Sequence, residues 1–148
     1  MQRAYKFSIL YFLVFSLLLL LSSVLLFSEK IGFSIESILG YYQGDEDKFI
    51  SAKSASGILK IVLPHIFAFG IFIMVSLHFV VFTNSRNSKL FHYIIYSAFV
   101  LGILELFTPL LIINGFVFFA YVKIITFFLF EFLMLYIFWI LFKSIVYD

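Results

Sequence analysis

The fold is decided by residues 90–142, which read LFHYIIYSAFVLGILELFTPLLIINGFVFFAYVKIITFFLFEFLMLYIFWILF. This segment contains two long apolar stretches, Leu90–Ile113 and Phe116–Phe142, separated by Asn114-Gly115. Each stretch is as long as the roughly 20 apolar residues that an α-helix needs to cross a bilayer. An Asn-Gly pair is typical of a tight reversal of the chain. The segment therefore predicts two antiparallel transmembrane helices.

Two further apolar stretches precede this pair, at 7–27 and 58–82. The first follows basic residues, as in a signal peptide, but it is long for one and lacks a convincing small-residue cleavage site, so we interpret it as a retained span. Pro64 lies within the second, so either the deep helix begins at Pro64 or residues 58–63 form a turn before a kink. We therefore predict an all-α membrane protein, an antiparallel four-helix transmembrane bundle in a single domain, 1–148.

Residues 28–57 form a polar loop that includes one short amphipathic helix, Ser34–Gln43. Its apolar positions recur at helical spacing, Ser34 is placed to cap it, and Gly44 can end it. Such a helix is expected to lie at the membrane interface on the external face. The acidic run 45–47 that follows is interpreted as solvated, with a site for a hard cation as the alternative.

The composition restricts the class of protein and the chemistry. The chain is 64% hydrophobic and 12% charged, whereas soluble domains have about 45–50% apolar and about 25% charged residues. The excess apolar surface is expected to face the lipid bilayer. The absence of cysteine excludes disulfide chemistry, thiolate metal sites and iron–sulfur clusters. The net charge of +2 is small and no basic patch is present, so nucleic acid is not expected as a partner.

The distribution of charge predicts the orientation in the membrane. The short flanks on the side of the two termini carry an excess of basic residues, whereas the long loop on the other side also carries five acids. The positive-inside rule then places both termini in the cytoplasm. The basic residues expected on that side are Arg3, Lys6, Arg86, Lys89 and Lys143.

Two histidines are candidate ligands of a b-type haem. His78 and His92 lie at similar distances from the turn around Arg86, so their depths agree within about 3 Å if the two helices are antiparallel neighbours. Two histidines at one depth on adjacent helices could ligate one haem iron from opposite faces. The bases near this turn would lie at the level of the propionates. The alternative is that histidines near span ends sit at the interface or form hydrogen bonds within the bundle.

The third histidine, His65, lies about 20 Å from His78 along the same predicted helix. Such a pair resembles the haem-bearing helices of membrane cytochromes b, in which each histidine serves a different haem. On an ideal helix, however, the two side chains point about 140° apart, and the chain has only three histidines. We therefore expect at most one haem. A quinone near His65 or His78 is a further possibility.

Three charged residues lie within the predicted spans. Glu105 and Lys123 are nearly equidistant from the Asn114-Gly115 reversal, so they are expected at one depth and predict an ion pair that fixes the hairpin. Part of a proton path is the alternative. No base shares the depth of Glu131, which could be protonated and hydrogen-bonded, face a partner subunit, or belong to a proton route.

The segment GFSIESILGYYQG, residues 32–44, followed by His65 and His78, resembles small bacterial membrane proteins that accompany respiratory cytochromes. The resemblance covers about residues 30–83 and carries no catalytic motif. It implies a location in the bacterial inner membrane and a partner that is a membrane subunit or a cytochrome.

Three functions follow from these features, and none includes an independent catalytic activity. The first is an electron-transfer subunit that holds haem b between His78 and His92 and is linked to a quinone pool or a partner cytochrome. The second is a cofactor-free accessory or assembly subunit of a larger respiratory or transport complex. The third is proton or solute transport through Glu105 and Glu131.

Overall fold

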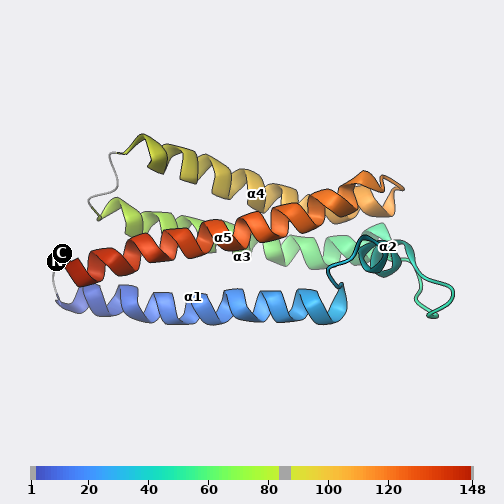
Figure 1. The fold of residues 1–148 in the computed structure, drawn as a ribbon, viewed down its shortest axis with the longest axis horizontal. Helices are drawn as coiled ribbons and strands as arrows, with labels where there is room; N and C mark the ends of the chain where they lie inside the picture. The colour runs from blue at the N-terminus through green and yellow to red at the C-terminus, as the bar shows by residue number, and fades with distance from the viewer. Residues whose placement is uncertain (1–2, 84–87, 148) are drawn as a thin grey trace.

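The computed structural model describes residues 3–83 and 88–147, and these are almost entirely helical (Figure 1). Four of the helices are long and apolar enough to cross a membrane. The prediction of an all-α membrane bundle with four spans is therefore confirmed. The helices are α1 (Arg3–Lys30), α2 (Ile35–Gln43), α3 (Ala55–Val81), α4 (Lys89–Ile113) and α5 (Phe118–Tyr147).

Serine side chains set the starts of three helices. Ser34, Ser54 and Ser88 each accept a hydrogen bond from a backbone N–H in the first turn of α2, α3 and α4, which satisfies donors that have no partner within the helix. The cap predicted at Ser34 is present, and Gly44 ends α2 as expected. Because α3 starts at its Ser54 cap, residues 58–63 are helical and Pro64 lies inside a continuous helix.

The helix α5 occupies the centre of the bundle (Figure 1). It makes its most extensive contacts with α4, which precedes it across the turn at Gly115. A φ of 91° at this glycine lies in the left-handed region that permits such a reversal. The helix α3 packs against both α4 and α5, whereas α1 packs against α5. The short α2 lies across the ends of α4 and α5.

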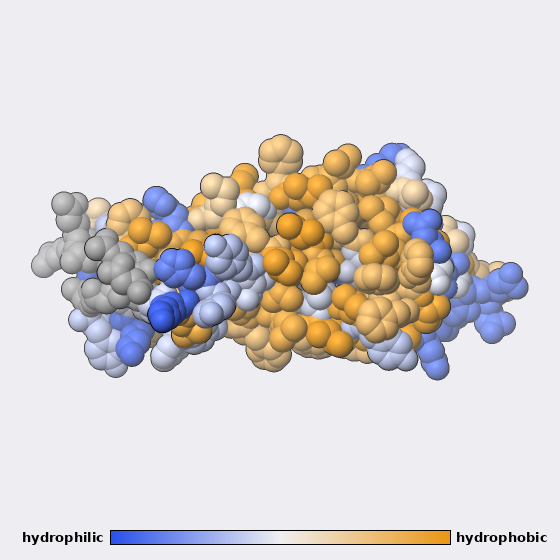
Figure 2. Space-filling model, turned by 90° about the horizontal axis from the view of Figure 1, so that it is seen from above, coloured by the Kyte–Doolittle hydropathy of each residue, from blue (hydrophilic) through white to orange (hydrophobic). Residues whose placement is uncertain are grey.

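The buried apolar side chains form two clusters, one in each half of the bundle. The larger cluster, towards the start of α1 and the end of α5, is centred on Ile9, Met134 and Ile137, which are all completely buried. The smaller cluster lies under α2, where the Phe27 and Phe127 rings stack at 4.2 Å. On the face drawn in Figure 2, apolar residues also dominate the surface of the middle of the molecule, with polar residues concentrated at the two ends. This is the surface expected of a protein surrounded by lipid.

Gly44 provides a test of the loop that follows α2. Its φ is +95°, and a Cβ would lie 2.9 Å from Ala52 N and 3.0 Å from Ile50 O. We expect Gly44→Ala to lower the free energy of unfolding by about 1–3 kcal/mol, as for other strained backbone positions. Thermal unfolding in detergent measures the change. Gly70→Ala is the control, because a Cβ there meets no atom within 4 Å; equal melting temperatures for the two variants would contradict the strain at Gly44.

Candidate functional site

An ion pair joins Glu105 of α4 to Lys123 of α5 in the interior of the bundle. The two residues are only 7% and 6% exposed, so the pair is shielded from lipid and water. The Lys123 ammonium donates to one carboxylate oxygen of Glu105 and, at 2.9 Å, to the Glu105 backbone carbonyl. The Thr126 hydroxyl lies 3.0 Å from the second carboxylate oxygen. Both carboxylate oxygens of this buried acid therefore have polar partners.

Pro109 explains why the backbone carbonyl of Glu105 is available to Lys123. In a regular helix this carbonyl would accept a hydrogen bond from the N–H of residue 109, but proline has no N–H. A carbonyl left without a donor inside the membrane would be costly. The Lys123 ammonium supplies that donor from the neighbouring helix. Pro109 and Lys123 therefore act together, and the sequence pattern alone did not link them.

The helix α2 covers the end of the bundle nearest this ion pair. Tyr42 is 5% exposed, and the Gln43 amide donates to the Ile112 carbonyl at 2.8 Å. Burial raises the pKa of the Tyr42 phenol, and the nearby Glu105 and Tyr41 raise it further. The phenol therefore stays neutral at physiological pH. A neutral, buried aromatic side chain of α2 thus lies near the ion pair.

Glu131 of α5 has a partner that the sequence analysis missed. The Ser23 hydroxyl of α1 lies within hydrogen-bonding distance of the Glu131 carboxyl, which is 7% exposed. The same hydroxyl lies 3.0 Å from the Leu20 carbonyl. Because serine has one hydrogen, both bonds form together only when a protonated Glu131 donates to Ser23. The signal in the sequence was the Ser22-Ser23 pair, two adjacent polar residues within the apolar stretch 7–27.

The three histidines lie on the surface of the single chain. His65, His78 and His92 are all exposed. Nδ1 of His65 is 2.6 Å from the Ile61 carbonyl, and Nδ1 of His92 is 3.3 Å from the Ser88 carbonyl. The His78 ring packs edge-on against Phe82. Haem ligation by His78 and His92 stays a prediction, and Arg86, expected near the propionates, lies outside the described residues.

The acidic run after α2 is held in place by an ion pair and by backbone hydrogen bonds within the same loop. Asp45 pairs with Lys48 at 3.0 Å, and this partner lowers the pKa of the Asp45 carboxyl and keeps it ionised. The backbone groups of Asp45 and Ile50 exchange two hydrogen bonds of 2.9 Å. In the part of the chain that the structure describes, no three histidines and acids are grouped so that they could hold a metal ion.

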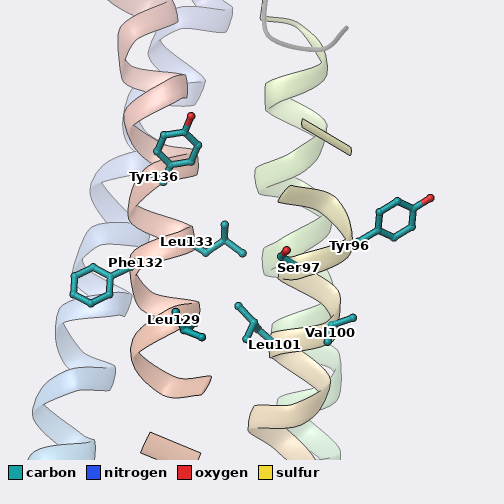
Figure 3. Close-up of a pocket in the computed structure, with 8 residues that line it drawn as sticks. All are labelled: Tyr96, Ser97, Val100, Leu101, Leu129, Phe132, Leu133 and Tyr136. Atoms are coloured by element: carbon teal, nitrogen blue, oxygen red, sulfur yellow. The ribbon is translucent and has the colours of Figure 1, made fainter. Parts of the chain in front are cut away.

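Two adjoining cavities lie along α4 and α5. The larger, of about 610 Å³, is an open groove between the middle parts of the two helices (Figure 3). The smaller, of about 270 Å³, lies where α4 begins and α5 ends. Neither is lined by a histidine or by a residue of the ion pair. The sequence analysis did not anticipate either cavity.

The ion pair can be tested by stepwise replacement. Lys123→Met leaves the Glu105 carboxylate and carbonyl without their donor, so we expect the free energy of unfolding in detergent to fall by about 3–5 kcal/mol. The double variant Glu105→Met/Lys123→Met removes the buried charge and should recover most of this loss.

The double variant still leaves the backbone carbonyl of residue 105 without a donor, which costs about 1–3 kcal/mol. Adding Pro109→Ala returns an N–H at the right position and should recover this remainder. If Pro109→Ala has the same effect in the wild-type chain as in the double variant, the link between Pro109 and Lys123 is wrong.

Comparison with known proteins identifies a family. A family model described as a transmembrane helical domain matches residues 32–148. The match covers α2 to α5, including both residues of the ion pair, and leaves out all of α1. No curated protein and no solved structure matches the chain. The chain is therefore a multi-pass membrane protein that belongs to the Aq_1264_TM family of transmembrane helical domains.

Proposed function

We propose that the protein is a cofactor-free accessory subunit of a larger membrane complex, which it joins through the face of α3 around His65. This proposal is carried by the exposure of His65 within a membrane-spanning helix. The resemblance of residues 30–83 to proteins that accompany respiratory cytochromes favours a respiratory complex of the bacterial inner membrane. The described charges at the end where α1 starts, Lys6, Lys89 and Lys143, favour cytoplasmic termini.

The depth of His65 makes its exposure costly in lipid. The 27 residues of α3 extend over about 40 Å, whereas the hydrocarbon core is about 30 Å thick. His65 lies about 15 Å from the first residue of α3, which is about 10 Å inside the hydrocarbon for a centred helix. Its Nδ1 is bonded to the Ile61 carbonyl, so Nε2 is the ring nitrogen that remains for a further partner. Polar groups at this depth generally face another helix.

The surroundings of His65 fit a contact with another helix. Only 17% of the most apolar 18-residue segment of α3 is buried within the chain, compared with 44% for α5. The exposed residues next to His65 include Ala68, whose small side chain lets a second backbone approach closely. A donor or acceptor on that helix would satisfy Nε2.

The internal charges support an accessory role over transport. Glu105 is bound by Lys123 and Thr126, and Glu131 by Ser23. Neither acid lines the two cavities described above. Both acids thus join helices of one chain, as expected for groups that hold a bundle together.

The proposal can be tested by photo-crosslinking in native membranes. A photoreactive amino acid at position 68 should give an adduct with a different membrane polypeptide. An interhelical hydrogen bond in a membrane contributes about 1–2 kcal/mol, so His65→Leu should weaken association about 5- to 30-fold. His92→Leu is the matched control, because His92 is also exposed and bonded to a backbone carbonyl. A monomeric wild type, or equal effects of the two variants, would refute the proposal.

Electron transfer through haem b is the second candidate function. It is favoured by the hydrogen bond between Nδ1 of His92 and the Ser88 carbonyl, because axial histidines usually donate Nδ1–H to such a group and bind metal through Nε2. A reduced-minus-oxidised absorption spectrum of protein purified from haem-replete cells decides between the two functions. A b-type α-band that is lost in both His78→Ala and His92→Ala supports electron transfer, whereas a featureless spectrum supports the accessory role.

A further inference from the structure

The two cavities along α4 and α5 form one continuous surface, because Tyr136 lines both of them. The groove is lined almost entirely by apolar side chains, with Val100 and Leu101 on one side and Leu129 and Phe132 on the other (Figure 3). The cavity at the end of the bundle is instead lined by Thr83, Ser88, Lys143 and Ser144 in addition to aromatic residues. An apolar groove therefore leads to a polar mouth.

The length of this surface matches one leaflet of a bilayer. Leu129, deep in the groove, and Lys143, at the mouth, are about 21 Å apart along α5 at 1.5 Å per residue. Half of a bilayer, including its headgroup region, is about 20–22 Å thick. A lipid lying along α5 would thus have its acyl chain beside Leu129 and its headgroup beside Lys143.

The charge of the mouth selects the kind of headgroup. None of the residues that line the mouth is acidic. The acids in the described parts of the chain lie at the α2 end or inside the bundle, whereas Lys6, Lys89 and Lys143 lie at this end. The Lys143 ammonium is exposed, 5.4 Å from the centre of the Trp139 ring, and it makes no ion pair with a described residue. Basic pockets of this kind between membrane helices bind anionic headgroups.

The geometry points to a binding site for one anionic phospholipid. Its phosphodiester lies against the Lys143 ammonium, where the Ser88 hydroxyl can donate a hydrogen bond. One acyl chain lies in the groove between α4 and α5, beneath the Tyr136 ring. A zwitterionic lipid has the same chains but a headgroup without net charge, so it is bound less well. This site is independent of the subunit contact proposed for His65, which lies on α3.

The single tryptophan of the chain, Trp139, lines the mouth and can report on this site. The protein is reconstituted in phosphatidylcholine vesicles that contain a small, matched fraction of either brominated phosphatidylglycerol or brominated phosphatidylcholine. Bromine quenches the fluorescence of a tryptophan that it contacts. We expect the anionic lipid to quench Trp139 at lower mole fractions than the zwitterionic lipid. Equal quenching by the two lipids would overturn the proposal.

Substitutions then separate a specific site from a general surface charge. Loss of one lysine near an anionic lipid surface corresponds to about a fivefold change in binding, so Lys143→Gln should raise the half-quenching fraction of phosphatidylglycerol about fivefold. Lys89→Gln is the control, because Lys89 lies at the same end but lines neither cavity. Equal effects of the two variants would mean that the lipid responds only to the net charge of this end, and the site would be refuted.

A third pair of variants tests the groove itself. Val100→Phe fills the groove with an aromatic ring and should reduce the preference for phosphatidylglycerol without removing any charge. Ile103→Phe, at an exposed position of α4 that does not line the groove, should leave the preference unchanged. An unchanged preference in Val100→Phe would overturn the placement of the acyl chain.

Discussion

The structure depends on the rule that a polar group inside the hydrocarbon region must find its partner within protein. Pro109 interrupts the regular hydrogen bonding of α4, because it has no N–H to donate to the Glu105 carbonyl. The Lys123 ammonium repairs this defect and neutralises the Glu105 side chain at the same time. Lys123 of α5 thus binds both the free backbone carbonyl and the carboxylate of Glu105 on α4. The α4–α5 pair that results is the platform on which α2, α3 and α1 pack.

The helix α1 obeys the same rule, but its buried polar contact with α5 is a hydrogen bond of a hydroxyl and not an ion pair. One polar link from α1 to α5 is the hydrogen bond between Ser23 and Glu131, and a second is the 3.1 Å hydrogen bond that the Lys6 ammonium donates to the Ile145 carbonyl. The residues that α1 contributes to the core clusters are apolar. Glu131 lies in the region that defines the family, whereas Ser23 lies outside it. In this chain, an acid of the matched region therefore has its partner in a helix outside that region. The sequence analysis looked for a base at the depth of Glu131, whereas the partner in the structure is a serine hydroxyl.

The spans and the ion pair were predictable because they depend on distances along the chain. Apolar length identifies membrane helices, and counting residues from the Asn114-Gly115 reversal brings Glu105 and Lys123 to one depth. The direction in which a side chain points was not predictable in the same way. In this chain, residues facing lipid are as apolar as residues facing the core, so helical periodicity does not separate the two. Three features depend on the direction in which side chains point from their helices and were therefore not predicted. They are the exposure of the histidines, the Ser23 partner of Glu131, and the groove between α4 and α5.

The ion pair also has a consequence for biosynthesis. A helix that enters the bilayer alone with a charged residue near its centre bears a cost of about 2.5–3.5 kcal/mol for that residue. Glu105 lies near the middle of α4 and Lys123 in the second turn of α5, so each helix would bear part of this cost separately. The two helices are joined by a short turn at Gly115, so their charges can meet while both are still at the translocon. Inserting the two helices together as a hairpin therefore costs less than inserting them one at a time, because the charges are paired before they face lipid.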